Sequence, residues 1–160
     1  MPAVTDLLIT PEPPDSTLAA ALLDRYFREL AARFPGGPGV FEPARIAVSP
    51  TEFTPPHGVF LIARLDGQAV GCGAVRTLDA DVAEIKRMWV DSGVRGLGIG
   101  RRLLAALEGA AAELACRTVR LDTAAYLTEA LPLYVSAGYA EIPAYNDNPY
   151  SAHWLEKRLR

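Results

Sequence analysis

The chain has 160 residues, of which 50% are apolar, and its 16 basic and 19 acidic side chains give a net charge of −3 and a pI near 5.4. This length favours a single domain, residues 1–160, with a sizeable core. The acidic balance argues against a general binder of nucleic acid or anionic membranes, which would present a broad basic surface, so any positive site must be local.

The first third of the chain predicts a strand, a helix and an irregular segment. Residues 6–10 form a short apolar run typical of a strand. Apolar residues at helical spacing then predict an amphipathic helix over 17–34, with Asp15 or Ser16 as its N-cap. The segment 40–57 is rich in proline, so we expect irregular backbone there, and such loops often contact substrates.

A hairpin and a further strand follow. Two apolar runs around Asp66-Gly67 predict a β-hairpin over 58–78, because this dipeptide favours the tight turn between paired strands. Residues 81–91 predict the next strand. Regular alternation would give this strand one face made by every second side chain: Val82, Glu84, Lys86, Met88 and Val90.

A glycine-rich turn precedes the next predicted helix. A Walker A loop requires Lys-Ser/Thr after its last glycine, but two arginines follow Gly100. A dinucleotide fingerprint requires a third glycine where Arg101 stands. The turn instead offers unobstructed backbone N–H groups at a helix N-terminus, beside Arg95, which favours a pyrophosphate held without a metal ion. The alternative is simply a tight strand-to-helix connection.

Positive charge is concentrated around this turn. Between residues 86 and 102 the only acid is Asp91, and five side chains are basic: Lys86, Arg87, Arg95, Arg101 and Arg102. This segment is the local positive site that an anionic ligand would need in an acidic protein.

The remaining chain predicts alternating helices and strands. An amphipathic helix follows the glycine turn, and a shorter helix over 129–136 ends at Gly138. Strands are predicted at 118–124, 139–145 and 152–159. Strands mixed with helices in this way are typical of an α/β layer fold.

The sequence offers little support for a metal site, a disulfide or export. Its cysteines, Cys72 and Cys116, and its histidines, His57 and His153, do not form the spacings of a zinc site. We see no basic region followed by an apolar run near residue 1, and no eighteen-residue apolar stretch. We therefore expect a cytoplasmic protein with reduced thiols.

Three motifs resemble those of one known family. The sequence VDSGVRGLGIGRRLL, residues 90–104, is similar to the acetyl-CoA loop of the GNAT N-acetyltransferases, in an Arg-Gly-x-Gly-x-Gly form of their signature. EIKRMWV, residues 84–90, resembles the family's fourth strand, and EALPLYVSAGYAEI, residues 129–142, resembles its second motif. Three motifs in the family's order and spacing are more specific than any one alone.

The resemblance implies an α/β (α+β) fold with a mixed, mostly antiparallel sheet flanked by helices. This sheet would splay open between its fourth and fifth strands, near 84–90 and 119–122, and hold acetyl-CoA in the gap. Backbone N–H groups of Met88 and Val90 would bind the pantetheine arm and the thioester carbonyl. The cofactor-binding residues implied are Met88, Trp89, Val90, Arg95, Gly96, Leu97, Gly98, Ile99, Gly100 and Arg101. The family often has asparagine where this chain has Leu127, so that contact is not expected.

The resemblance also suggests catalytic residues. Tyr134 corresponds to the tyrosine that protonates the departing sulfur, with a packing role as the alternative. Glu84 is the candidate base: alternation places it on the face of Met88 and Val90, among mostly apolar neighbours, from where it would relay the proton of the amine through water. The alternative for Glu84 is an ordinary strand residue paired with Lys86 or Arg87.

The expected reaction is direct transfer of an acetyl group to a primary amine of a small molecule or peptide. The resemblance implies an acceptor pocket walled by the helix 17–34, the segment 40–57 and the loop 144–153. Within that loop, Tyr145, Asn146 and Asp147 would either recognise a cation or form a turn. We expect a monomer or homodimer without nucleic-acid or membrane partners. The alternative function is a non-catalytic acyl-CoA sensor or interaction module on the same fold.

Overall fold

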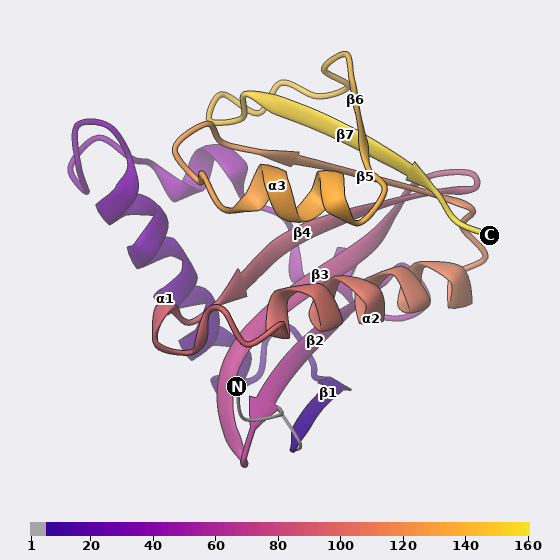
Figure 1. The fold of residues 1–160 in the computed structure, drawn as a ribbon, viewed down its shortest axis with the longest axis horizontal. Coiled ribbons are helices and arrows are strands. Elements are labelled where there is room, and N and C mark those ends of the chain that lie inside the picture. Colours follow the sequence, from indigo (N-terminus) through magenta and orange to yellow (C-terminus); the bar gives the residue numbers. More distant parts are fainter. Residues whose placement is uncertain (1–5) are drawn as a thin grey trace.

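The computed structural model describes residues 6–160, which form a seven-stranded sheet in the order β1-β2-β3-β4-β5-β7-β6 (Figure 1). The paired strands are antiparallel except for β4 and β5, which are parallel. The strands are β1 (Leu7–Pro11), β2 (Gly58–Leu65), β3 (Gln68–Asp79), β4 (Val82–Val90), β5 (Thr118–Thr123), β6 (Ala140–Ile142) and β7 (His153–Arg158).

Helices cover both faces of the sheet. The α-helices are α1 (Thr17–Arg33), α2 (Ile99–Glu113) and α3 (Ala130–Ser136), and the 3-10 turns are η1 (Pro43–Ile46), η2 (Pro50–Phe53) and η3 (Ser92–Val94). The buried face of α2, with Leu103 and Leu107, packs on one side of β2–β5. Leu22 of α1 packs on the other side, with Phe60 and Trp89. The expected mixed fold flanked by helices is therefore confirmed.

The predicted helix cap and hairpin turn are present in the structure. Ser16, rather than Asp15, caps α1, because its Oγ accepts a hydrogen bond from the Ala19 N–H at 3.0 Å. Asp66 and Gly67 have φ of +49° and +81°, the left-handed pair that a tight hairpin turn requires. The segment 40–57 is less irregular than expected, since it contains η1 and η2.

The sheet opens between β4 and β5. The two strands pair only at their first residues, where Val82 lies opposite Thr118 and Glu84 lies opposite Arg120. Beyond Glu84 the register gives no further pair among the described residues, and Figure 1 shows the strands parting, with α3 in front of the opening. This confirms the predicted splay, which leaves backbone groups on the facing edges available to a ligand.

The regular alternation predicted for residues 82–90 is wrong because β4 contains a β-bulge. Its register with β3 shifts between Cys72 and Ala74, and the bulged residue Arg87 has a φ of +61°. The extra residue exchanges the two faces of the strand. Met88 and Val90 consequently pack with the α2-side core, as Ile85 does, while Trp89 packs on the α1 side.

Candidate active site

A cavity of about 310 Å³ lies where α1, the end of β4, the glycine turn and α3 meet. Its lining includes nearly all of the predicted cofactor-binding residues: Met88, Trp89, Val90, Arg95, Gly96, Gly98, Ile99, Gly100 and Arg101. Leu97 does not line it, because its side chain packs against the core cluster that contains Leu7 of β1. Leu127, where the family often has asparagine, is a further wall of the cavity.

The glycine turn leaves the N-terminus of α2 open toward this cavity. Gly96 and Gly98 have φ of +87° and +80°, and Gly98 is the N-cap of the helix. The first N–H groups of a helix have no acceptor within the helix and attract anions. Gly100 differs because it is helical, and a Cβ there would lie 3.4 Å from Leu133 Cδ2. Among the glycines of this turn, Gly96 and Gly98 are therefore the ones that need glycine for their backbone conformation.

The basic segment does not form one positive patch. Arg95 and Arg101 line the first cavity, whereas Lys86 and Arg87 line a second one. The Arg95 side chain is also held in place by other residues. Its guanidinium pairs with Glu29 of α1, and its Nε donates a hydrogen bond to the Val90 carbonyl at 3.1 Å.

Backbone donors of β4 face the opening in the sheet. The Asp91 N–H donates to the Val70 carbonyl of β3 at 2.7 Å, so the Val90 N–H points to the opposite edge. The Val90 carbonyl also points away from β3, because it accepts a hydrogen bond from the Arg95 side chain. Met88, two residues earlier and next to the bulge, lines the same cavity. The buried indole N–H of Trp89 has no hydrogen-bond partner within residues 6–160.

Tyr134 lies at the junction of the two cavities and lines both. Its side chain is 8% exposed, and its hydroxyl contacts only the Met88 sulfur, at 3.8 Å, among the hydrogen-bond partners in the described chain. Burial raises the pKa of Tyr134 above its usual range, and nearby Tyr26 and Asp122 add to the shift. The phenol therefore stays protonated at neutral pH and has no strong acceptor of its own.

The second cavity, of about 100 Å³, lies on the other side of Tyr134 and Met88. Its walls come from the three segments expected to form the acceptor pocket. Tyr26 belongs to α1, Phe41 to the segment 40–57, and Tyr150 to the loop 144–153. We call this space the acceptor cavity.

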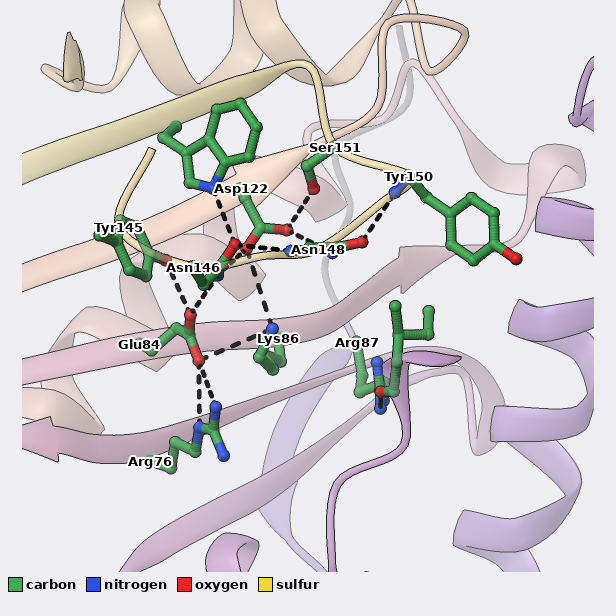
Figure 2. Close-up of polar contacts among 12 residues, drawn as sticks. Arg76, Glu84, Lys86, Arg87, Asp122, Tyr145, Asn146, Asn148, Tyr150 and Ser151 are labelled. Carbon is green, nitrogen blue, oxygen red and sulfur yellow. Dashed lines mark hydrogen bonds and ion pairs between the residues drawn. The ribbon is translucent and has the colours of Figure 1, made fainter. Parts of the chain in front are cut away.

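The surroundings predicted for Glu84 are wrong. Because of the bulge, it does not share a face with Met88 and Val90, and it lines neither cavity. Although only 1% exposed, it lies among charged and polar groups rather than apolar ones. Its carboxylate accepts two hydrogen bonds from Arg76 at 3.0 and 2.9 Å and one from Tyr145 at 2.8 Å, as Figure 2 shows.

Asp122 is a carboxylate at the acceptor cavity that the sequence analysis missed. Its oxygens accept hydrogen bonds from Asn146 at 2.7 Å, Asn148 at 3.0 Å and Ser151 at 2.6 Å (Figure 2). The signal available was an acid within the apolar strand 118–124. The loop residues Tyr145 and Asn146 thus bind the chain's own carboxylates, and Asn146 also makes the expected turn by accepting from the Asn148 N–H.

No group of three or more His, Cys, Asp or Glu side chains within 6–160 is placed to hold a metal ion. Both cysteines are free and buried, and burial raises the pKa of the Cys72 thiol to about 12. In the same part of the chain no helix is long and apolar enough to cross a bilayer.

The chain is similar in sequence to several curated proteins. Over 104 residues the chain is 36% identical to an IAA acetyltransferase of Azospirillum brasilense, covering 62% of this chain and 67% of that protein. Its matches span 32% to 67% of the length of four curated relatives.

Solved structures match almost the whole chain. A Klebsiella pneumoniae protein described as a candidate acyl-CoA N-acyltransferase superposes with a TM-score of 0.78 at 28% identity, covering 96% of this chain and 98% of that one. A GNAT family acetyltransferase from Elizabethkingia anophelis, solved with acetyl-CoA bound, superposes with a TM-score of 0.66 at 18% identity, covering 97% and 99%.

The family match covers the segments that build the first cavity and most of the acceptor cavity, whose loop 144–153 lies beyond the matched range. Residues 18–139 match the acetyltransferase (GNAT) family model, a range that includes α1, β4, the glycine turn and Tyr134. Together with the open sheet and the glycine turn at the α2 N-terminus, this match shows that the chain belongs to the GNAT acetyltransferase family.

Proposed function

We propose that the protein transfers an acetyl group from acetyl-CoA directly to a primary amine of a small molecule or peptide. One observation carries this proposal. Two cavities meet at Met88 and Tyr134, inside the opening between β4 and β5. The first suits the donor and the second the acceptor, so both substrates would bind at once and the amine would attack without an acyl-enzyme step.

The residues of the first cavity fit acetyl-CoA. The open N-terminus of α2, with the left-handed Gly96 and Gly98, suits a pyrophosphate. Arg95 and Arg101 add positive charge beside it. The free edge of β4 suits the amide groups of a pantetheine arm, which would pair with it as an added strand does.

Bound acetyl-CoA supplies a thioester that an amine can attack. The N–H of Val90 or Met88 would hold the thioester carbonyl and stabilise the negative charge that develops on its oxygen. Tyr134 would donate its phenolic proton to the sulfur as the carbon–sulfur bond breaks. The amine loses one proton to water in the acceptor cavity, and water restores the proton on Tyr134.

Two carboxylates compete for the role of proton acceptor. The sequence suggested Glu84, but this side chain lines neither cavity and holds Arg76 instead. Asp122 lines the acceptor cavity, although its oxygens already accept three hydrogen bonds from neutral donors. We therefore propose that water takes the proton, that Asp122 orders this water, and that Glu84 positions Lys86 and Tyr145.

The experiment that tests this function is a thiol-release assay with purified protein, acetyl-CoA and a panel of amines. The panel includes amino acids, polyamines, aminoglycosides and peptide N-termini, and mass spectrometry identifies the acetylated product. Coenzyme A binding with product formation supports an enzyme. Binding without turnover on any amine, above hydrolysis in its absence, would favour the sensor or interaction module. Sedimentation and cell fractionation test the predicted monomer or homodimer and the predicted cytoplasmic location.

A further inference from the structure

Arg87 is a buried cation at the acceptor cavity that the mechanism does not use. It is 7% exposed and lines the cavity beside Lys86, and it also lines a neighbouring cavity together with Phe27. Its Nη2 donates to the Ile46 carbonyl at 2.5 Å, and its guanidinium lies 5.1 Å from the centre of the Phe27 ring. Within the described chain no carboxylate lies within 4.0 Å of it, and Figure 2 shows it beside, but apart from, the ion pairs of Lys86.

Lys86 differs from Arg87 in having counter-charges. Its Nζ lies 3.6 Å from Glu84 Oε1 and 3.9 Å from Asp122 Oδ2. Its charge is therefore balanced by the protein, whereas that of Arg87 is not. A guanidinium does not lose its proton in a protein, and a buried charge without a partner is costly. An anion on a ligand in this cavity would remove that cost.

The backbone of Arg87 also points to function. Its left-handed φ of +61° is unfavourable for a residue with a long side chain, and it occurs at the bulge of β4. This bulge brings a cation to the acceptor side one residue before Met88, which lines both cavities. The positive group consequently lies close to the junction where the amine would react.

Part of the wall of the acceptor cavity is aromatic. Phe41 and Tyr150 have ring centroids 4.8 Å apart, and Phe34 packs on both and on Tyr126. Of these rings, Phe41, Tyr126 and Tyr150 line the cavity. A ligand there would meet both a cation and an apolar aromatic surface.

We propose that the acceptor is a small amine that also carries an anionic group, bound by Arg87, and an apolar group against the aromatic wall. This rests on the proposed function. Apolar amino acids and their phosphonic or phosphinic analogues have this chemistry, since each presents an oxyanion near a primary amine. A bidentate guanidinium contact suits both kinds of oxyanion.

Matched acceptors test this proposal on the wild-type protein. Phenylalanine is compared with phenylalaninamide, phenethylamine and the aminophosphonate analogue, at pH values that give equal fractions of neutral amine. We expect kcat/KM to be at least about tenfold higher for the two anionic amines, as for a hydrogen bond to a charged group. We also expect 3-phenylpropanoate, which lacks the amine, to compete with the acceptor but not with acetyl-CoA.

Variants locate the anion site. Arg87→Gln should raise KM for phenylalanine by about tenfold or more while leaving KM for phenethylamine and the affinity for coenzyme A unchanged. Arg87→Lys should keep part of the preference. The matched control is Arg64→Gln, a strand arginine that donates to Thr10 and lines neither cavity. Thermal unfolding of each variant identifies any loss of folding.

Each outcome bears on a different claim. If neutral amines react as well as amino acids, or if 3-phenylpropanoate does not compete, the anionic acceptor is wrong and the acetyltransferase function stands. If Arg87→Gln lowers stability but leaves the preference for anionic amines intact, Arg87 only anchors the segment 40–57 through Ile46. If no amine of either kind reacts, the proposed function itself fails. Because the wild-type comparison needs no variant, poor folding of Arg87→Gln would not leave the proposal untested.

Discussion

Replacing Tyr134 with phenylalanine removes one hydroxyl at the junction of the two cavities. The hydroxyl contacts the Met88 sulfur at 3.8 Å, a weak acceptor, while the ring packs 5.9 Å from the ring of Tyr139. The substitution keeps the ring and leaves no strong acceptor unpaired. We therefore expect the free energy of unfolding to change by less than about 1 kcal/mol.

The effect of Tyr134→Phe on turnover should be much larger. If the phenol protonates the leaving sulfur, its loss should lower kcat by about a hundredfold, which corresponds to about 2.7 kcal/mol of transition-state stabilisation. The affinity for coenzyme A, measured by calorimetry, should remain within about twofold, because the hydroxyl acts only in the transition state.

A neighbouring tyrosine provides the matched control. Tyr139 is 3% exposed, its hydroxyl donates to Glu108 at 2.8 Å, and it lines neither cavity. Tyr139→Phe should therefore lower stability by about 1 kcal/mol, through the lost hydrogen bond, without changing kcat. Full turnover of Tyr134→Phe on the best acceptor, or an equal loss in both variants, would refute the assignment of Tyr134 as the acid.

Four other predictions follow from the site. Gly98→Val should cost about 1–2 kcal/mol of stability and weaken coenzyme A binding, because the residue has a φ of +80°, whereas exposed Gly109→Ala in α2 should stabilise slightly without altering binding. Glu84→Gln should cost about 3 kcal/mol in urea unfolding through the lost pairing with Arg76; a fall in kcat confined to low pH, with stability intact, would instead identify Glu84 as the base. Arg95→Ala should weaken coenzyme A binding less at high salt than at low salt, since a partly exposed charge is screened, and an unchanged salt dependence would contradict this. Because burial raises the pKa of Tyr134, the acid stays protonated below that pKa, so kcat should not decline between pH 7 and 10; a decline lost in Tyr134→Phe would show that the phenol ionises earlier.

Much of the fold and of the lining of the first cavity was predictable, because these features depend on residues that are close together in the chain. The hairpin turn at Asp66-Gly67, the N-cap at Ser16 and the glycine turn before α2 are each encoded within a few residues. The order and spacing of three motifs extended this to the open sheet and to most of the lining of the first cavity. The glycine turn was recognisable because its backbone conformation needs glycine at fixed positions.

The acceptor side was decided only by the tertiary structure. Strict alternation placed Glu84 with Met88 and Val90, but the bulge at Arg87 depends on pairing with β3 and exchanges the faces. The partners of Glu84 come from positions 8 and 61 residues away in the chain, and no local pattern specifies them.

The same limit applies to the charges. In the sequence the five basic residues over 86–102 suggest one positive site, yet in the fold Arg95 lines the first cavity and Arg87 lines the acceptor cavity. Asp122 stood out in the sequence only as an acid within an apolar strand, because its place at the acceptor cavity depends on partners in the loop 144–153. The sequence by itself determined the local backbone geometry that suits the donor, whereas long-range packing determined which charges face the acceptor.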